Sequence, residues 1–250
     1  MKFIKVLFLL SLSFGLLVAC NNAEHTETKS TETNEILKAD TVNEQVLVSK
    51  NWQCVQLKTN ENIGDLESDV TVIENTKVKV EVKNIQLLKS FSYGFILDNE
   101  LHVNNNIAQY NFSLSDKKTH FGVSYLLDSE GLVIKNPETI NTFFVIKDSK
   151  IKVKSSLDTE AALFLNLPNS AIANPRVIID FVLLNTNIAK GARYVKLNID
   201  GEEINIHNWS GYEIKGLQTG KHNLKLSLCE ANGKLVKGTF TEVEKKFEVK

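Results

Sequence analysis

Strict alternation of apolar and polar residues restricts the fold of this chain more than any other feature. The segment Lys77–Lys83 alternates at every position, which is the pattern of a β-strand with one face in solvent. Turn-forming pairs such as Asp98-Asn99, Asp200-Gly201 and Asn232-Gly233 accept the positive φ angles of tight hairpins. No long helical periodicity is present. The sequence therefore predicts an all-β protein, with further strands of the same half-exposed kind at 91–97, 121–127, 194–199 and 223–229.

The alternation repeats itself along the chain. Four pairs of residues of the same type are separated by a constant 102 positions, and the strand patterns between them align almost without gaps. A constant spacing of this kind indicates two copies of one structural unit. We therefore expect two modules, one over 45–149 and one over 150–250. The pairs are Asp98 and Asp200, Tyr110 and Tyr212, His120 and His222, and Gly131 and Gly233.

Each copy contains about seven short strands in roughly a hundred residues, which favours an immunoglobulin-like β-sandwich. In the second copy, Trp209-Ser210-Gly211-Tyr212 precedes Gly220-Lys221-His222. This arrangement resembles small immunoglobulin-like modules of bacterial envelope lipoproteins. The resemblance implies two tandem sandwiches, and it speaks to fold far more than to activity, because such sandwiches have many functions. The first copy has Ile107 where the second has Trp209, so any role of Trp209 belongs to one module.

The first nineteen residues have the pattern of a secretory signal peptide. Lys2 and Lys5 precede an apolar run that is too short to span a membrane, which needs about 20 apolar residues. The run ends at Leu17-Val18-Ala19-Cys20, which resembles the bacterial lipobox. The resemblance implies cleavage before Cys20 and lipidation of its thiol, and an acyl anchor would give lasting membrane attachment. The alternative is an ordinary signal peptide that contains a cysteine.

Residues 20–44 differ sharply in composition from the remainder of the chain. Residues 21–44 contain six acidic and two basic side chains, several threonines and few large apolar residues. A segment of this kind cannot bury enough apolar surface to offset its ordering entropy, so we expect a disordered acidic tether after the lipidated Cys20. Residues 45–250 contain 25 basic and 24 acidic residues, and this balance argues against nucleic acid as a partner.

The sequence contains no pattern that indicates a catalytic residue or a cofactor. No close pairing of cysteine or histidine suggests a metal site, and nucleophile-elbow, phosphate-binding and calcium-loop motifs are missing. His120 and His222 occupy equivalent positions, which favours a repeated structural role such as a bond to a backbone carbonyl. Beyond Cys20, the chain has Cys54 and Cys229, which could form a disulfide in an exported protein. Their separation in the chain leaves that pairing open.

One segment of the second module is a candidate ligand contact. His207, Trp209 and Tyr212 place aromatic rings near polar side chains, a combination that could bind a sugar or a peptide. The alternative interpretation is that Trp209 and Tyr212 fill the interior of the sandwich. If Trp209 forms a binding platform, its replacement by alanine should remove binding and leave stability unchanged.

Together these patterns predict a non-enzymatic, lipid-anchored envelope protein of the outer membrane, whose two modules serve binding or adhesion. The membrane would be contacted through the lipid, and the other partner is a protein or glycan that the sequence does not identify. Two alternatives stay open. One is a carbohydrate- or peptide-binding lipoprotein that uses Trp209, and the other is a metallochaperone or accessory enzyme that uses the thiols and histidines.

Overall fold

The computed structural model describes residues 45–58, 65–74, 77–112, 118–146, 150–154, 160–168 and 176–250, which belong to one compact unit over Val42–Lys250. The predicted signal peptide, Cys20 and the acidic tether lie outside the described residues, and so do parts of both predicted modules. Within the described part of the chain, no helix has the length and apolar character needed to cross a membrane.

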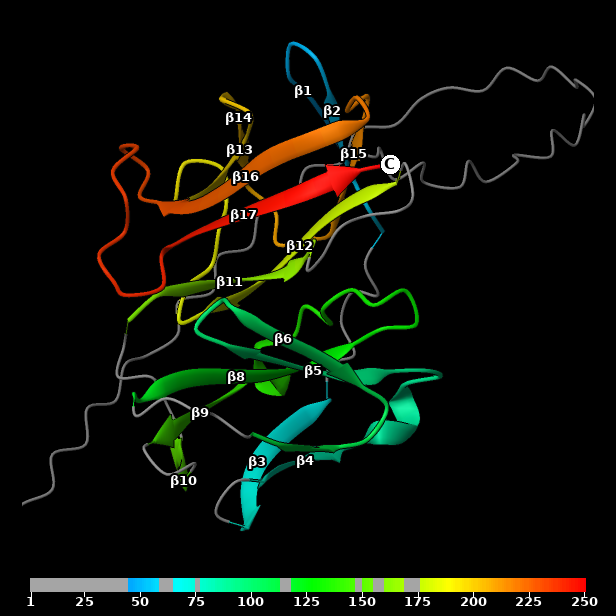
Figure 1. Ribbon diagram of the computed structural model, residues 1–250, viewed down its shortest axis with the longest axis vertical. Helices are drawn as coiled ribbons and strands as arrows, with labels where there is room; N and C mark the ends of the chain where they lie inside the picture. Colours follow the sequence, from blue (N-terminus) through cyan, green and yellow to red (C-terminus); the bar gives the residue numbers. More distant parts are fainter. Residues whose placement is uncertain are drawn as a thin grey trace, which may run out of the picture. The chain divides into compact units, whose positions relative to one another are not determined.

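The regular secondary structure of the described residues is almost entirely β-strand, which confirms the predicted all-β class (Figure 1). They form seventeen strands and two short 3₁₀ helices, η1 (Ile85–Leu87) and η2 (Pro137–Thr139). The strands are β1 (Val46–Val48), β2 (Gln53–Gln56), β3 (Glu67–Glu74), β4 (Lys77–Lys83), β5 (Ser92–Leu97), β6 (Leu101–Asn105), β7 (Gln109–Asn111), β8 (His120–Leu127), β9 (Asn141–Ile146), β10 (Lys150–Lys154), β11 (Ala162–Leu167), β12 (Val177–Leu184), β13 (Tyr194–Ile199), β14 (Glu202–Ile206), β15 (Tyr212–Lys215), β16 (Gly220–Cys229) and β17 (Glu242–Val249).

The strands form two sandwiches with the same topology. In the first, a three-stranded sheet β3-β4-β7 faces a sheet of order β6-β5-β8-β9-β10. In the second, strands β11-β12-β15 correspond to β3-β4-β7, and the sheet β14-β13-β16-β17 corresponds to β6-β5-β8-β9. All pairings are antiparallel. This is the tandem immunoglobulin-like sandwich that the sequence predicts.

The equivalent residues of the two copies make equivalent contacts. Asp98 and Asp200 lie in hairpin turns with φ angles of 50° and 52°. The Oδ1 atom of Asp98 accepts a hydrogen bond from the backbone N–H of Phe121, and Oδ1 of Asp200 accepts one from Asn223, each at 2.8 Å. The repeat in the sequence is therefore a repeat of local geometry as well as of strand order.

The module boundaries differ from those predicted. Strands β1 and β2 precede the first sandwich in sequence, but β2 pairs with β15 and extends the second sandwich's sheet to the order β1-β2-β15-β12-β11. Figure 1 shows these blue strands beside the orange β15. Conversely, β10 pairs with β9 and completes the first sandwich. Residues 45–57 therefore belong to the second module and residues 150–154 to the first, the reverse of the prediction. Strand pairing, and not position along the chain, decides to which module each segment belongs.

Both faces of several strands are buried, which the sequence interpretation did not expect. The core of the first sandwich includes Phe95 and Phe143, and that of the second includes Phe181 and Tyr212. A third apolar cluster joins β5 and β8 of the first sandwich to β11 and β12 of the second. The segments 91–97 and 121–127 were predicted to have one face in solvent. That prediction is wrong for both β5 and β8, because the second sandwich covers their outer faces.

Candidate functional site

The most distinctive site of the chain is the junction between the two sandwiches. Three phenylalanine rings from different strands and loops pack together there: the centroid of Phe121 lies 5.7 Å from that of Phe164 and 5.2 Å from that of Phe240. Phe164 and Phe240 are 5.1 Å apart. The side chain of Asn99 also bonds to the backbone of β11, donating to the carbonyl of Leu163 at 3.0 Å and accepting from the N–H of Leu165 at 2.9 Å.

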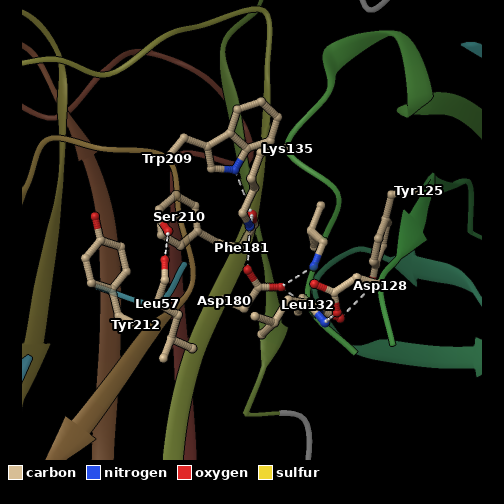
Figure 2. Close-up of polar contacts among 12 residues, drawn as sticks. Leu57, Tyr125, Asp128, Leu132, Lys135, Asp180, Phe181, Trp209, Ser210 and Tyr212 are labelled. Carbon is tan, nitrogen blue, oxygen red and sulfur yellow. Dashed lines mark hydrogen bonds and ion pairs between the residues drawn. The ribbon is translucent and has the colours of Figure 1, made fainter. Parts of the chain in front are cut away.

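A buried carboxylate lies beside this apolar contact. Asp180, in the middle of β12, has no exposed surface, and Oδ1 forms an ion pair with Nζ of Lys135 from the first sandwich (Figure 2). The other oxygen, Oδ2, accepts a hydrogen bond from the backbone N–H of Val133 at 2.8 Å and one from Nδ2 of Asn166 at 2.7 Å. A buried charge is tolerated only when it is paired and hydrogen-bonded, and Asp180 meets both conditions.

Asn166 extends the network back into the first sandwich. Its Oδ1 atom accepts a hydrogen bond from the hydroxyl of Tyr125 at 2.9 Å, and its Nδ2 also donates to the carbonyl of Gly131 at 3.0 Å. Burial, together with the nearby charge of Asp180, raises the pKa of Tyr125 well above its usual value. Tyr125 therefore stays protonated and acts as a donor across the junction.

Lys135 is covered on the other side by aromatic rings. Its Nζ donates to the carbonyl of Phe181 at 3.0 Å and lies 5.5 Å and 5.7 Å from the ring centroids of Phe181 and Trp209. Burial lowers the pKa of Lys135, against the opposing effect of the charge and hydrogen bond of Asp180. The Trp209 indole N–H donates to the same Phe181 carbonyl at 2.9 Å. The cation is thus enclosed by one carboxylate, one carbonyl and two rings.

The arrangement joins the sandwiches rather than leaving reactive groups open. The side chains of Lys135 and Asp180 are 6% and 0% exposed, so the ion pair is closed to a ligand of ordinary size. Lys135, Tyr125, Asn166 and Asp180 each have a partner from the other sandwich. A satisfied buried network of this kind specifies one relative position of the two sheets, because any shift would leave a charge unpaired.

The predicted ligand contacts do not gather on one surface. Tyr212 has no exposed surface and donates its hydroxyl to the carbonyl of Asn208 at 2.7 Å, so it belongs to the core and is withdrawn as a ligand contact. Trp209 is half-buried against Lys135, and its indole N–H is already bonded. His207 is half-buried, with its ring 5.6 Å from that of Tyr194. Tyr212 therefore fills the interior of the second sandwich completely, and Trp209 does so in part.

The two cysteines of the described chain are free buried thiols, and the disulfide left open by the sequence is not formed. Cys54 packs in the core of the second sandwich, whereas Cys229 of β16 lies outside that core cluster and its Sγ atom contacts the carbonyl of Ser227. Burial raises the pKa of Cys54 to about 12 and also raises that of Cys229. Among the residues that the structure describes, no group of three metal-binding side chains is found.

The repeated histidines have the structural role expected of them. Nδ1 of His120 lies 2.7 Å from Oδ2 of Asp98, and Nδ1 of His222 lies 2.6 Å from Oδ2 of Asp200. Nε2 of His222 also contacts the carbonyl of Gln218 at 2.8 Å. The partner shared by both copies is a carboxylate from the preceding hairpin, and His222 also makes the kind of contact with a backbone carbonyl that the sequence suggested.

Lys135, Asn166 and Asp180 were not identified from the sequence as site residues. One signal was available, because Asp180 interrupts the otherwise apolar strand Val177–Leu184. A carboxylate inside a strand that is apolar on both sides needs a buried partner. The identity of that partner could not be predicted, since Lys135 comes from a loop of the other module.

No protein-family model matches the chain, and none of the curated proteins is similar to it. Among solved structures, fibronectin type III-like modules of Clostridium thermocellum CbhA align with 74% of this chain and 94% of their own, at 14% identity and a TM-score of 0.28. The central fibronectin type III array of RIM-binding protein aligns with 73% of this chain and 67% of its own, at 11% identity and a TM-score of 0.26. A Corynebacterium diphtheriae protein described as membrane-anchored aligns with 74% of this chain and 58% of its own, at 10% identity and a TM-score of 0.25. The fold assignment rests on the strand order and registers of this chain.

Proposed function

We propose that this chain is a lipid-anchored cell-envelope protein, without catalytic activity, that presents two immunoglobulin-like sandwiches as one rigid binding or adhesion unit. The observation that carries the proposal is the closed junction, where the ion pair of Lys135 and Asp180 and the three phenylalanine rings fix one module on the other. A fixed pair of modules suits a protein that displays a surface to a partner, because little conformational freedom is lost on binding.

The membrane part of the proposal depends on the lipobox-like Leu17-Val18-Ala19-Cys20 and the acidic segment that follows it. Lipidation at Cys20 would place the unit at the envelope, with the outer membrane as the proposed location, on about twenty-five residues of tether. A flexible tether of this length allows the rigid unit to reach partners away from the lipid surface.

The anchor is tested by expressing the full chain in a bacterial host with an alkyne analogue of palmitate. We expect label on the wild-type protein and recovery in the membrane fraction, whereas Cys20→Ala should lose the label. Cys229→Ser is the matched control and should keep both the label and the membrane location. Equal labelling of the wild type and Cys20→Ala would contradict lipidation at this residue.

The non-catalytic role is tested with the unlipidated Cys20→Ala chain and panels of esterase, glycosidase, peptidase and phosphatase substrates. We expect no turnover above that of a denatured sample. Turnover that requires folded protein, and that is lost when a single side chain of the two sandwiches is replaced, would overturn this part of the proposal. Stoichiometric zinc or copper in protein purified without a tag would favour the metallochaperone alternative.

A further inference from the structure

Among the residues that the structure describes, strand β1 has no partner strand at one edge of a five-stranded sheet. The order is β1-β2-β15-β12-β11, so β1 pairs with β2 on one side only. At the other end of this sheet, β11 is covered by the first sandwich through the junction described above. Figure 1 shows β1 at the margin of the second sandwich. An open edge is a template for pairing with another strand.

The hydrogen-bond pattern identifies which backbone groups of β1 face this open edge. The N–H of Ser49 bonds to the carbonyl of Trp52 at 2.9 Å, and the N–H of Gln56 bonds to the carbonyl of Gln45 at 3.0 Å. In an antiparallel pair, hydrogen-bonding positions alternate along the strand, so Gln45, Leu47 and Ser49 face β2. The N–H and C=O groups of Val46 and Val48 therefore face away from β2.

The side chains of β1 leave this edge unprotected. Leu47 packs against the core of the second sandwich, whereas Val46 and Val48 are 47% and 67% exposed. Edge strands of soluble proteins are usually blocked by charged residues, especially lysine. The edge strands β3 and β10 carry such charges, β3 with Glu67 and Asp69 and β10 with its three lysines, and the uncharged edge strands β6 and β7 carry polar side chains. By contrast, β1 is entirely aliphatic.

We propose that β1 pairs with β1 of a second copy of this chain, in antiparallel register centred on Leu47. Val46 would then face Val48 of the second copy, and Val48 would face its Val46. Both are hydrogen-bonding positions, so the two chains exchange four backbone hydrogen bonds and the two sheets join into one of ten strands.

The second copy fits this edge because β1 presents two exposed valines, Val46 and Val48, on one face of the strand. In the register centred on Leu47, each exposed valine lies opposite an exposed valine of the second copy, and cross-strand β-branched pairs of this kind stabilise a sheet. The flanking Gln45 and Ser49 are uncharged, so no like charges meet near the two-fold axis. An isologous contact of this kind closes at two subunits, because each β1 has one open edge.

Sedimentation of the unlipidated Cys20→Ala chain over a wide concentration range tests the pairing independently of the lipid anchor. We expect a monomer–dimer equilibrium whose dissociation constant rises at least about tenfold in Val46→Lys/Val48→Lys, because two lysines per edge oppose strand pairing. Val72→Lys is the control, since Val72 is 39% exposed on the edge strand β3, and it should leave the equilibrium unchanged. Melting curves verify that each variant is folded.

The register is tested by oxidising an equimolar mixture of Val46→Cys and Val48→Cys chains, both in the Cys20→Ala background. A cross-linked dimer should form faster in the mixture than in either variant alone, because residue 46 of one copy lies opposite residue 48 of the other. A wild-type chain that stays monomeric, a dimer unaffected by the lysine variant, or equally fast cross-linking within one variant would each overturn the proposal.

Discussion

Lys135 and Asp180 illustrate how a few buried residues decide the relation between the two modules. The pair is almost completely removed from solvent, and the carboxylate also bonds to Val133 and Asn166. A buried ion pair adds little stability compared with an apolar contact of the same volume, but removal of one partner leaves an uncompensated charge. The pair is therefore a determinant of position more than a source of stability.

Replacing Lys135 by methionine should lower the free energy of unfolding by about 3–5 kcal/mol, because Asp180 would remain buried without its counter-ion. Urea denaturation followed by tryptophan fluorescence measures the change. Lys225→Met is the control, since Lys225 pairs with Glu242 and Glu244 on an exposed sheet face and should change stability by less than about 1 kcal/mol. Equal effects of the two substitutions would contradict the assigned role of Lys135.

The His222–Asp200 contact predicts a pH dependence of stability. Burial of the His222 ring lowers its pKa, but the hydrogen bonds to Asp200 and Gln218 and the charge of Asp200 outweigh this effect and raise the pKa above 6.5. The stabilisation is therefore complete below pH 6.5 and is lost as the pH rises through the raised pKa.

Urea unfolding at a series of pH values from 5 to 8.5 tests this dependence. Asp200→Asn keeps an oxygen for the N–H of Asn223 but removes the charge, so the loss of stability with rising pH should be smaller than in the wild type. Parallel pH profiles of the two proteins would show that His222 does not contribute.

At the scale of the strands, close packing between neighbouring strands depends on glycine at two places. A Cβ atom at Gly94 of β5 would lie 2.2 Å from the ring of Tyr125 on β8, and one at Gly122 would lie 2.2 Å from the ring of Phe143 on β9. In each case the ring of the neighbouring strand lies over the glycine. Gly94 matters more for the junction, because the Tyr125 hydroxyl donates to Asn166.

Gly94→Ala should therefore lower the free energy of unfolding by about 1–3 kcal/mol, since the Tyr125 ring must move and its hydrogen bond to Asn166 is strained. Equilibrium denaturation measures the loss. Ser92→Ala, in the same strand and half-buried, serves as the control with an expected change of about 0.5 kcal/mol or less. A Gly94→Ala protein as stable as the wild type would contradict the close approach of β5 and β8.

Over the whole described unit, the two sandwiches share an apolar contact and therefore should unfold together. Phe164 is fully buried and contacts Phe121 and Phe240, which come from different parts of the chain. Because β2 belongs to the second sandwich, the chain passes between the modules twice, after β2 and after β10, instead of once. Both features oppose independent unfolding of one sandwich.

Scanning calorimetry of the unlipidated chain should accordingly give one transition. Phe164→Ala should cost about 3–5 kcal/mol and broaden or split that transition, because the junction loses its central ring. Val72→Ala, at an exposed position far in sequence from the junction, should keep a single transition. Two separate transitions in the wild type would contradict coupling of the sandwiches.

Local patterns determined the all-β class, the hairpin turns and the two-fold repeat, because alternation and turn residues act over a few neighbouring positions. Asp98 and Asp200 with their histidines could be placed in equivalent positions from spacing alone, although their bond to each other could not. Trp209 and Tyr212 stayed ambiguous, since an aromatic residue near a strand edge suits both a core and a surface.

Only the tertiary structure decided which strands pair across the chain and which faces meet. The outer face of β8 is buried, β1 and β2 pair within the second sandwich, and Lys135 forms an ion pair with Asp180, which lies 45 positions away in the sequence. Such contacts depend on how complete sheets fit together, and no local pattern encodes them. The free energy that selects them comes from burying surfaces and charges that lie far apart in the sequence.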